Sequence, residues 1–202
     1  MTTNNLKYEQ SLYEQGYQLI CGVDEAGRGP LAGPVVAAAV IFKKGFNNIE
    51  INDSKTLSAK KRKQLFEQIQ QDALAVSISI VDHQMIDDMN ILEAARYAME
   101  DAVSKLKVSP DYILTDYMDI KYQPYLAIKH GDRLSLSIAA ASIVAKVTRD
   151  RMMLAYDKQY PNYGFKDHKG YGTKKHLEAL RQYGASPIHR KTFKPVLAVL
   201  KK

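Results

Sequence analysis

The residues best suited to chemistry are two adjacent carboxylates that close an apolar run. Asp24 and Glu25 come directly after residues 19–23, which include leucine, isoleucine and valine, and a glycine-flanked cation, Arg28, follows three residues later. Carboxylates at the edge of apolar sequence are costly unless a cation meets them. A bound metal ion is one such cation, and Arg28 could meet an anionic substrate beside it. This combination indicates phosphate-ester chemistry.

Two further acids lie where other predicted strands end. Asp116 follows residues 112–115, and Asp132 comes shortly after residues 125–128. Strand ends that carry acids could converge at one sheet edge, where open α/β sheets place their sites. Carboxylates alone suit Mg²⁺ or Mn²⁺, and two such ions can hydrolyse a phosphodiester. Taken alone, Asp132 is better explained as a turn residue or a helix cap, and Asp116 is ambiguous.

Gly27 and Gly29 bear on how the acids could act together. Neighbouring residues of a regular strand face opposite sides, so Asp24 and Glu25 can reach the same metals only if the strand ends or distorts there. Gly27 permits such a distortion. The glycine spacing does not fit a dinucleotide fingerprint, and no P-loop lysine follows. Close approach of the backbone to a ligand, where it could read a sugar hydroxyl, is what these glycines allow.

Cations are in excess, with a net charge of +7 over 202 residues, which favours an anionic partner. Lys55, Lys146 and Arg149 are candidates for phosphate contacts. Tyr171 lies between glycines in a loop with a histidine and a lysine, a pattern suited to stacking on a sugar or base, although simple packing would also explain it. The basic segment 189–191 could contact backbone phosphate or take no part in binding.

Composition is that of a soluble globular protein, 46% hydrophobic and 25% charged. The single cysteine, Cys21, excludes a disulfide within the chain and a cysteine-based zinc site. The first residues lack the apolar stretch of a signal peptide, and no segment approaches the length of a membrane span. We therefore expect a cytoplasmic protein.

Hydrophobic periodicity predicts an α/β protein with a mixed sheet. The expected strands are residues 19–23, 35–42, 76–80, 112–115 and 125–128. The expected helices are a Ser58-capped helix to about residue 74, residues 91–106, residues 136–156, and a Thr173-capped helix that ends at residue 183. A boundary near residue 160 would divide a catalytic core, residues 1–160, from a C-terminal helical extension, residues 161–202.

Five motifs in this order resemble bacterial ribonuclease HII over roughly residues 17–197. They are GVDEAGRGPLAGPVV from residue 22, Asp-Ser-Lys at 53–55, Gly-Asp at 131–132 with SLSIAAASIVAKVTRD from 135, YGFKDHKGYGT from 163, and HRKTF from 189. The resemblance implies a ribonuclease H-like fold, a five-stranded mixed sheet flanked by helices with a C-terminal helical extension. It also implies an endoribonuclease that cuts the RNA strand of RNA–DNA hybrids and incises 5′ to ribonucleotides embedded in duplex DNA.

The resemblance also assigns roles to residues. It implies that Asp24, Glu25, Asp116 and Asp132 hold two divalent ions, Mn²⁺ or Mg²⁺, and that the products carry 3′-hydroxyl and 5′-phosphate ends. It implies that Gly27-Arg28-Gly29 senses the ribose 2′-hydroxyl and that Tyr171 stacks on the next deoxyribose. The expected substrate contacts are Gly27, Arg28, Gly29, Ser54, Lys55, Lys146, Arg149 and Tyr171, and we expect a monomer.

Two positions depart from the common family pattern, and three other functions remain as alternatives to that of ribonuclease HII. Tyr117 stands where many members have glycine, and His130 where many have lysine, but neither change removes an acid. The sister family ribonuclease HIII typically has threonine in place of Arg28, which favours the HII type. The rivals are a non-catalytic RNA–DNA hybrid binding module, a metal nuclease of broader substrate range, and a scaffold protein.

Overall fold

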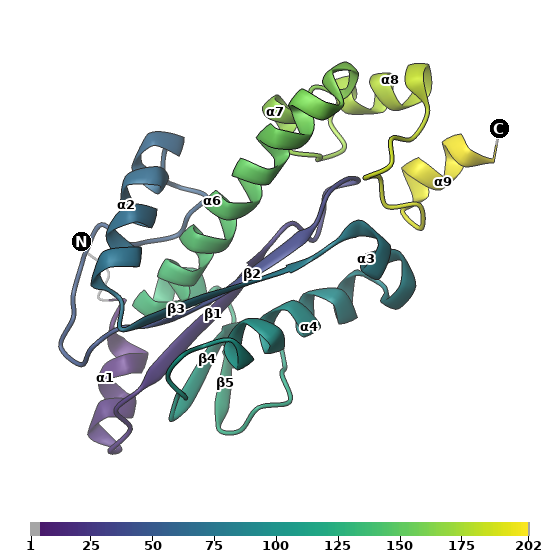
Figure 1. Ribbon diagram of the computed structural model, residues 1–202. Coiled ribbons are helices and arrows are strands. Elements are labelled where there is room, and N and C mark those ends of the chain that lie inside the picture. Colours follow the sequence, from purple (N-terminus) through teal and green to yellow (C-terminus); the bar gives the residue numbers. More distant parts are fainter. Residues whose placement is uncertain (1–4, 202) are drawn as a thin grey trace.

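The computed structural model describes residues 5–201, whose strands form one five-stranded mixed sheet in the order β3-β2-β1-β4-β5 (Figure 1). The strands are β1 (Ile20–Ala26), β2 (Val35–Ile41), β3 (Ala75–Val81), β4 (Tyr112–Asp116) and β5 (Tyr125–Ile128). Strands β1, β2 and β3 pair antiparallel, whereas β4 and β5 run parallel to β1. The predicted five-stranded mixed sheet is therefore confirmed.

Helices cover both faces of the sheet. Helices α2 and α6 lie on one face and α4 on the other, with the C-terminal helices beyond one end of the sheet (Figure 1). The helical elements are α1 (Lys7–Glu14), α2 (Ala59–Asp72), α3 (His83–Met89), α4 (Ile91–Ser104), α5 (Gly131–Leu134), α6 (Leu136–Gln159), η1 (Pro161–Tyr163), α7 (Phe165–His168), α8 (Lys174–Tyr183) and α9 (Lys194–Leu200).

Small residues let α6 approach the sheet closely. A Cβ atom at Gly22 would lie 2.0 Å from the backbone carbon of Ser137, so only glycine fits where β1 crosses this helix. The first half of α6 is alanine-rich and buried, and it shares one cluster with Ala38 and Val40 of β2. Interiors packed at this density tolerate no added methyl group. The contact fixes where α6 and the loop before it stand relative to β1.

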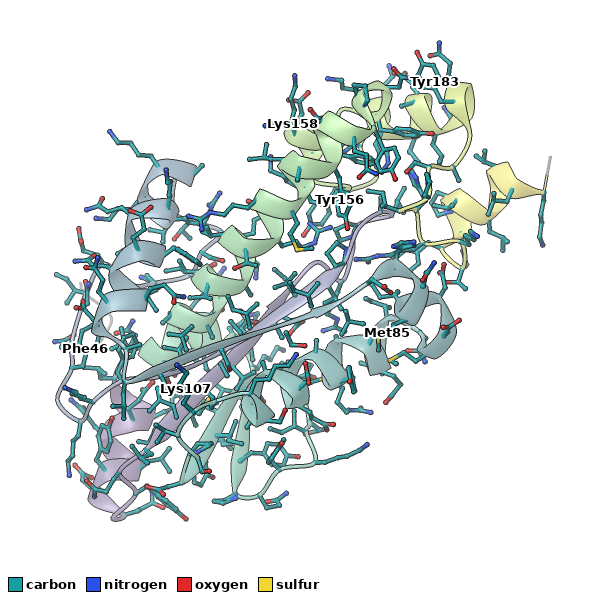
Figure 2. The ribbon with its side chains drawn as sticks, in the orientation of Figure 1. Phe46, Met85, Lys107, Tyr156, Lys158 and Tyr183 are labelled. Atoms are coloured by element: carbon teal, nitrogen blue, oxygen red, sulfur yellow. The ribbon has the colours of Figure 1, made fainter. Side chains whose placement is uncertain are left out.

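The segment after α6 packs on the end of that helix and on the loop after β1. Ala32, Met153 and Phe165 belong to one buried cluster, and Tyr156 of α6 packs against it (Figure 2). The backbone amide of Leu31 donates to the Gly170 carbonyl at 2.8 Å, which ties the two loops together. A division of the chain at residue 160 stays a prediction, because these contacts join the two sides of that boundary.

Most of the predicted elements are confirmed, with three differences. Residues 125–128 form a strand as predicted, and the Ser58 and Thr173 side chains cap α2 and α8. Strand β1 continues to Ala26, so both acids lie on the strand and not beyond it. Helices α3, α5 and α9 were not predicted, and residues 161–172, where no helix was expected, contain η1 and α7. Within residues 5–201, no helix is long and apolar enough to cross a membrane.

Candidate active site

Three neighbouring elements bring the four predicted acids to one end of the sheet. Asp24 and Glu25 lie near the end of β1, Asp116 ends β4, and Asp132 lies in the short helix α5 that follows β5. Strands β1, β4 and β5 are parallel neighbours, so their carboxyl ends share one edge. The Gly131 amide donates to an Asp116 carboxylate oxygen at 2.8 Å. Because Gly131 precedes Asp132, this bond connects the end of β4 to the helix that carries Asp132.

Asp24 and Glu25 line the same cleft although they are adjacent on a strand. The cleft holds about 310 Å³, and Asp116, Ser54 and Lys55 line it with them. Pairing of β1 with β2 continues to Ala26, but pairing with β4 ends at Val23. The β4-facing edge of β1 is therefore open at both acids, and a side chain can turn round it into the cleft.

Burial and neighbouring negative charges raise the pKa values of three of the acids. Burial raises the pKa of Asp24 well above its usual range, and the charges of Glu25 and Asp116 raise it further. Burial also raises the pKa of Glu25, although Arg28 opposes that effect, and it raises the pKa of Asp116 against the Gly131 hydrogen bond. These shifts share one cause, because each carboxylate lacks both water and enough positive charge.

Two side-chain cations contact this group of acids. Arg28 lies 3.4 Å from one oxygen of Glu25, and the exposed Lys55 ammonium lies 3.4 Å from Asp132, which is buried. The other oxygen of Glu25, Oε2, is buried without a hydrogen-bond partner. A buried carboxylate oxygen without a partner is costly, so the cleft favours an added cation.

The chemistry of the donors fits Mg²⁺ or Mn²⁺. All four acids offer oxygen atoms, the ligands that hard divalent cations prefer, and Glu25 Oε2 has no other partner. In the described part of the chain, no three acidic, histidine or cysteine side chains already stand in the arrangement of a metal-ligand shell. The fit thus rests on the oxygen donors, the mutual repulsion and the unpaired Glu25 atom.

The loop after β1, residues 27–34, forms the opposite wall of the cleft and is held by two buried arginines. Arg190 is fully buried, and its guanidinium donates to the carbonyls of Gly27, Arg28 and Gly33 at 2.6–3.0 Å. Gly27 has a φ of +105°, where a side chain would be strained. The loop therefore has a fixed backbone conformation before any ligand binds.

Arg149 needs a correction, because the sequence suggested a phosphate contact. Its side chain is 1% exposed, and it donates to the carbonyls of Ala32, Pro34 and Lys169. A guanidinium buried to this extent is not accessible to a phosphate. Arg149 instead connects α6 to the loop after β1 and to the Lys169 carbonyl after α7. Its role is therefore structural, like that of Arg190.

Tyr171 lines the cleft, as do the predicted polar contacts Arg28, Ser54, Lys55 and Lys146. Tyr171 is 44% exposed, and its ring lies beside Gly29, where an added Cβ would meet it at 3.5 Å. Ser54 is buried, with its hydroxyl 2.7 Å from the hydroxyl of Ser142. Lys146 lines the same cleft and pairs with Asp150 at 2.7 Å. Ser54, Lys55 and Lys146 therefore all remain candidates for substrate contacts.

Sequence reasoning missed the buried role of segment 189–191. His189 and Arg190 are fully buried, and His189 forms an antiparallel bridge with Ala32. The sequence alone offers two interpretations of this segment, a contact to backbone phosphate or no part in binding. Its apolar neighbours in the sequence, Ile188 and Phe193, were the available signal that this basic stretch enters the interior.

Comparisons with known proteins identify the family and the fold of this chain. Residues 21–196 match the family model described as Ribonuclease HII. The chain is 71% identical over 201 residues to Ribonuclease HII of Acholeplasma laidlawii, and the match covers 100% of both chains. The crystal structure of ribonuclease H2 from Pyrococcus horikoshii is 28% identical with a TM-score of 0.77, covering 91% of this chain and 97% of that one. Bst-RNase HIII in complex with Mn²⁺ shares the fold at 16% identity, with a TM-score of 0.69 and coverage of 94% and 71%.

Proposed function

The chain belongs to the ribonuclease HII family and is a ribonuclease H enzyme, and from this we propose its substrate and mechanism. We propose that it hydrolyses the RNA strand of RNA–DNA hybrids. It also incises duplex DNA on the 5′ side of an embedded ribonucleotide and leaves 3′-hydroxyl and 5′-phosphate ends. The observation that carries the proposal is the cleft itself, where repelling carboxylates face a rigid glycine-containing wall.

The carboxylates are the proposed metal ligands. Asp24, Glu25, Asp116 and Asp132 would hold two divalent cations, Mg²⁺ or Mn²⁺, and the Mn²⁺ bound by the structural neighbour Bst-RNase HIII supports this class of ion. Divalent cations bound there would supply an activated water and stabilise the leaving 3′ oxygen. Lys55, beside Asp132, would help to hold the scissile phosphate.

The wall of the cleft is the proposed reader of the sugar. Only a ribonucleotide carries a 2′-hydroxyl, so a contact to that group tells RNA from DNA. The backbone at Gly27-Arg28-Gly29 would contact it, because glycines let a ligand approach closely and Arg190 keeps this backbone in place. Tyr171 would stack on the sugar of the next nucleotide.

These contacts carry no information about base identity. Phosphate contacts position a duplex without reading its sequence, and the 2′-hydroxyl is the same on every ribonucleotide. We therefore expect the four ribonucleotides to be incised at similar rates in matched duplexes. A strong preference for one base in a survey of all four would contradict this mode of recognition. The cytoplasmic location and the monomeric state stay predictions.

The test is a duplex DNA oligonucleotide that contains one ribonucleotide, incubated with the protein and Mg²⁺ or Mn²⁺. We expect incision 5′ to the ribonucleotide, with no cut in an all-DNA duplex and none in the presence of a chelator. The position of the nick relative to the ribonucleotide is mapped first. Ligation of the nicked product would then confirm that the nick carries 3′-hydroxyl and 5′-phosphate ends. A folded protein that binds hybrids but cuts no substrate with either ion would favour the binding-module alternative.

A further inference from the structure

Three histidines are buried together behind the cleft wall, and the proposed mechanism uses none of them. His168, His176 and His189 come from α7, α8 and the segment before α9, and their rings contact one another and Phe165. All three are buried. Histidine is polar at both ring nitrogens, so a buried group of three needs a specific set of partners.

Hydrogen-bond partners fix the proton on each of two rings. The Ser186 amide donates to His189 Nδ1 at 2.9 Å, so this nitrogen is an acceptor and the proton of the neutral ring is on Nε2. His176 Nδ1 lies 2.9 Å from the Tyr171 carbonyl, which only accepts, so the proton of His176 is on Nδ1. The two Nε2 atoms are 3.0 Å apart, and only one of them then carries a proton.

The result is a hydrogen-bond chain with a single direction. It runs from the Ser186 amide through His189 and His176 to the carbonyl of Tyr171. Addition of a proton to either ring would place two N–H groups against each other, and burial already lowers the pKa of both rings to about 4. Both histidines are therefore neutral near pH 7, and the hydrogen-bond chain is intact at that pH.

The end of this chain is the residue that faces the cleft. The Tyr171 amide donates to the His168 carbonyl at 2.9 Å, and the Tyr171 carbonyl accepts from the Thr173 amide at 2.8 Å as well as from His176. The backbone of Tyr171 is thus held at both polar groups, while the residue is 44% exposed and its ring lies beside Gly29. A fixed backbone limits the positions that this ring can take.

We propose that His176 and His189 are positioning residues, which hold the Tyr171 ring where it meets the nucleotide beside the scissile phosphate. The proposal rests on the proposed function for the role of Tyr171 in substrate binding. The histidines touch no substrate in this arrangement and act through the Tyr171 carbonyl. Preorganised recognition groups of this kind improve binding because less order is lost when substrate arrives.

The matched pair of variants is His176→Asn and His176→Leu. The two new side chains have the same shape, and both leave His189 Nε2 without its acceptor. Only asparagine can still donate to the Tyr171 carbonyl, from an amide nitrogen placed like Nδ1. We expect the leucine variant to raise KM for a single-ribonucleotide duplex by roughly tenfold, the scale of a lost stacking contact. The asparagine variant should keep KM near the wild-type value, and kcat should change little in either.

Two further readouts separate positioning from general stability. Hydrogen exchange of segment 168–173 should be faster in His176→Leu than in His176→Asn, whether or not the protein cleaves. In a Tyr171→Ala background, His176→Leu should have no further effect on KM. Tyr163→Phe, which removes a hydroxyl bond to the Gly184 carbonyl at 2.9 Å, is the control for loss of stability in the same cluster.

Defined outcomes overturn the proposal. Equal KM and equal exchange for the asparagine and leucine variants would exclude positioning through Tyr171, as would an undiminished effect in the Tyr171→Ala background. If wild-type protein cuts no ribonucleotide duplex but exchange still separates the two variants, the proposed function fails and the positioning of Tyr171 stands. If the position-176 variants do not fold, His189→Gln and His189→Met provide the same comparison one step back along the chain.

Discussion

The two sides of the cleft satisfy their polar groups to very different degrees. On the carboxylate side, Asp24, Glu25 and Asp116 have raised pKa values, and one oxygen of Glu25 is buried without a partner. On the wall side, Arg149 and Arg190 are buried even more deeply, yet their hydrogen bonds reach backbone carbonyls at 2.6–3.2 Å. Burial alone therefore does not distinguish the two sides.

The difference indicates which side waits for a ligand. A cluster of buried acids with too little positive charge stores repulsion that a bound cation relieves, so it costs stability until that cation arrives. Buried arginines that bond only to backbone carbonyls have no charge partner to exchange and serve to fix the loop that they hold. The carboxylate side therefore favours binding of a cation, whereas the arginines keep the wall in one backbone conformation.

The largest expected effect comes from Asp24→Asn, which breaks the carboxylate side. Cleavage should fall by on the order of 10³-fold or more, because a preorganised charge at the reacting centre is lost. The metal-free protein should nevertheless melt at a higher temperature, since a buried repelling charge is removed. Cleavage assays and thermal melts measure the two effects.

The control for that variant is Asp72→Asn, at the exposed end of α2. It should change neither cleavage nor melting temperature. Addition of Mn²⁺ or Mg²⁺ should raise the melting temperature of the wild type more than that of Asp24→Asn. Retained cleavage by Asp24→Asn would remove this residue from the site.

Gly27→Ala tests whether the wall is as rigid as its bonds suggest. Its φ is +105°, and an added Cβ would lie 2.2 Å from Arg149 Nε, so we expect a loss of about 3 to 5 kcal/mol in the free energy of unfolding. Gly45→Ala is the matched control, with a φ of +87° and nothing within 4 Å of the new Cβ. It should cost only the backbone strain, about 1 to 2 kcal/mol. Equal losses in urea denaturation would show that the wall yields.

Arg28→Ala acts where the two sides meet, because Arg28 is exposed on the wall and lies 3.4 Å from Glu25. If this element reads the ribonucleotide, the preference for a single-ribonucleotide duplex over an all-RNA strand in a hybrid should change by roughly tenfold. Competition between the two substrates measures it. Arg181→Ala, on the exposed face of α8, is the control, and unchanged selectivity in Arg28→Ala would refute the role.

The dependence of stability on pH should have opposite signs on the two sides. His176 and His189 have pKa values of about 4 in the folded protein and 6.5 ordinarily, so the unfolded chain takes up protons first. Their contribution is complete above about pH 6.5 and is lost as the pH falls toward about 4. Asp24 has a raised pKa in the folded protein, so its protonation stabilises the folded state as the pH falls.

Urea midpoints between about pH 7.5 and pH 4.5 separate these contributions. His176→Asn removes one imidazole and should make the acid-side loss of stability shallower. Asp24→Asn removes an opposing carboxylate and should make that loss steeper. Parallel curves for wild type and both variants would contradict the assignment of opposite signs.

Several parts of this structure were determined by local sequence. The apolar alternation predicted β3, and the Ser58 and Thr173 side chains cap their helices because hydroxyls accept from free amides two or three residues on. The pair Asp24-Glu25 predicted a site because acids at the end of an apolar strand are costly unless a cation meets them. Such signals depend only on residues close in the chain.

Tertiary structure decided the fate of the cations and of the buried histidines. The sequence predicted a phosphate contact for Arg149. In the fold, α6 places this side chain against the carbonyls of Pro34 and Ala32, which lie 115 and 117 positions earlier in the chain. Arg190 bonds to the Gly27 carbonyl across 163 positions, and no local pattern encodes that partner. A guanidinium or an imidazole takes its role from whichever polar groups the fold places around it, and those groups come together only when the chain has folded.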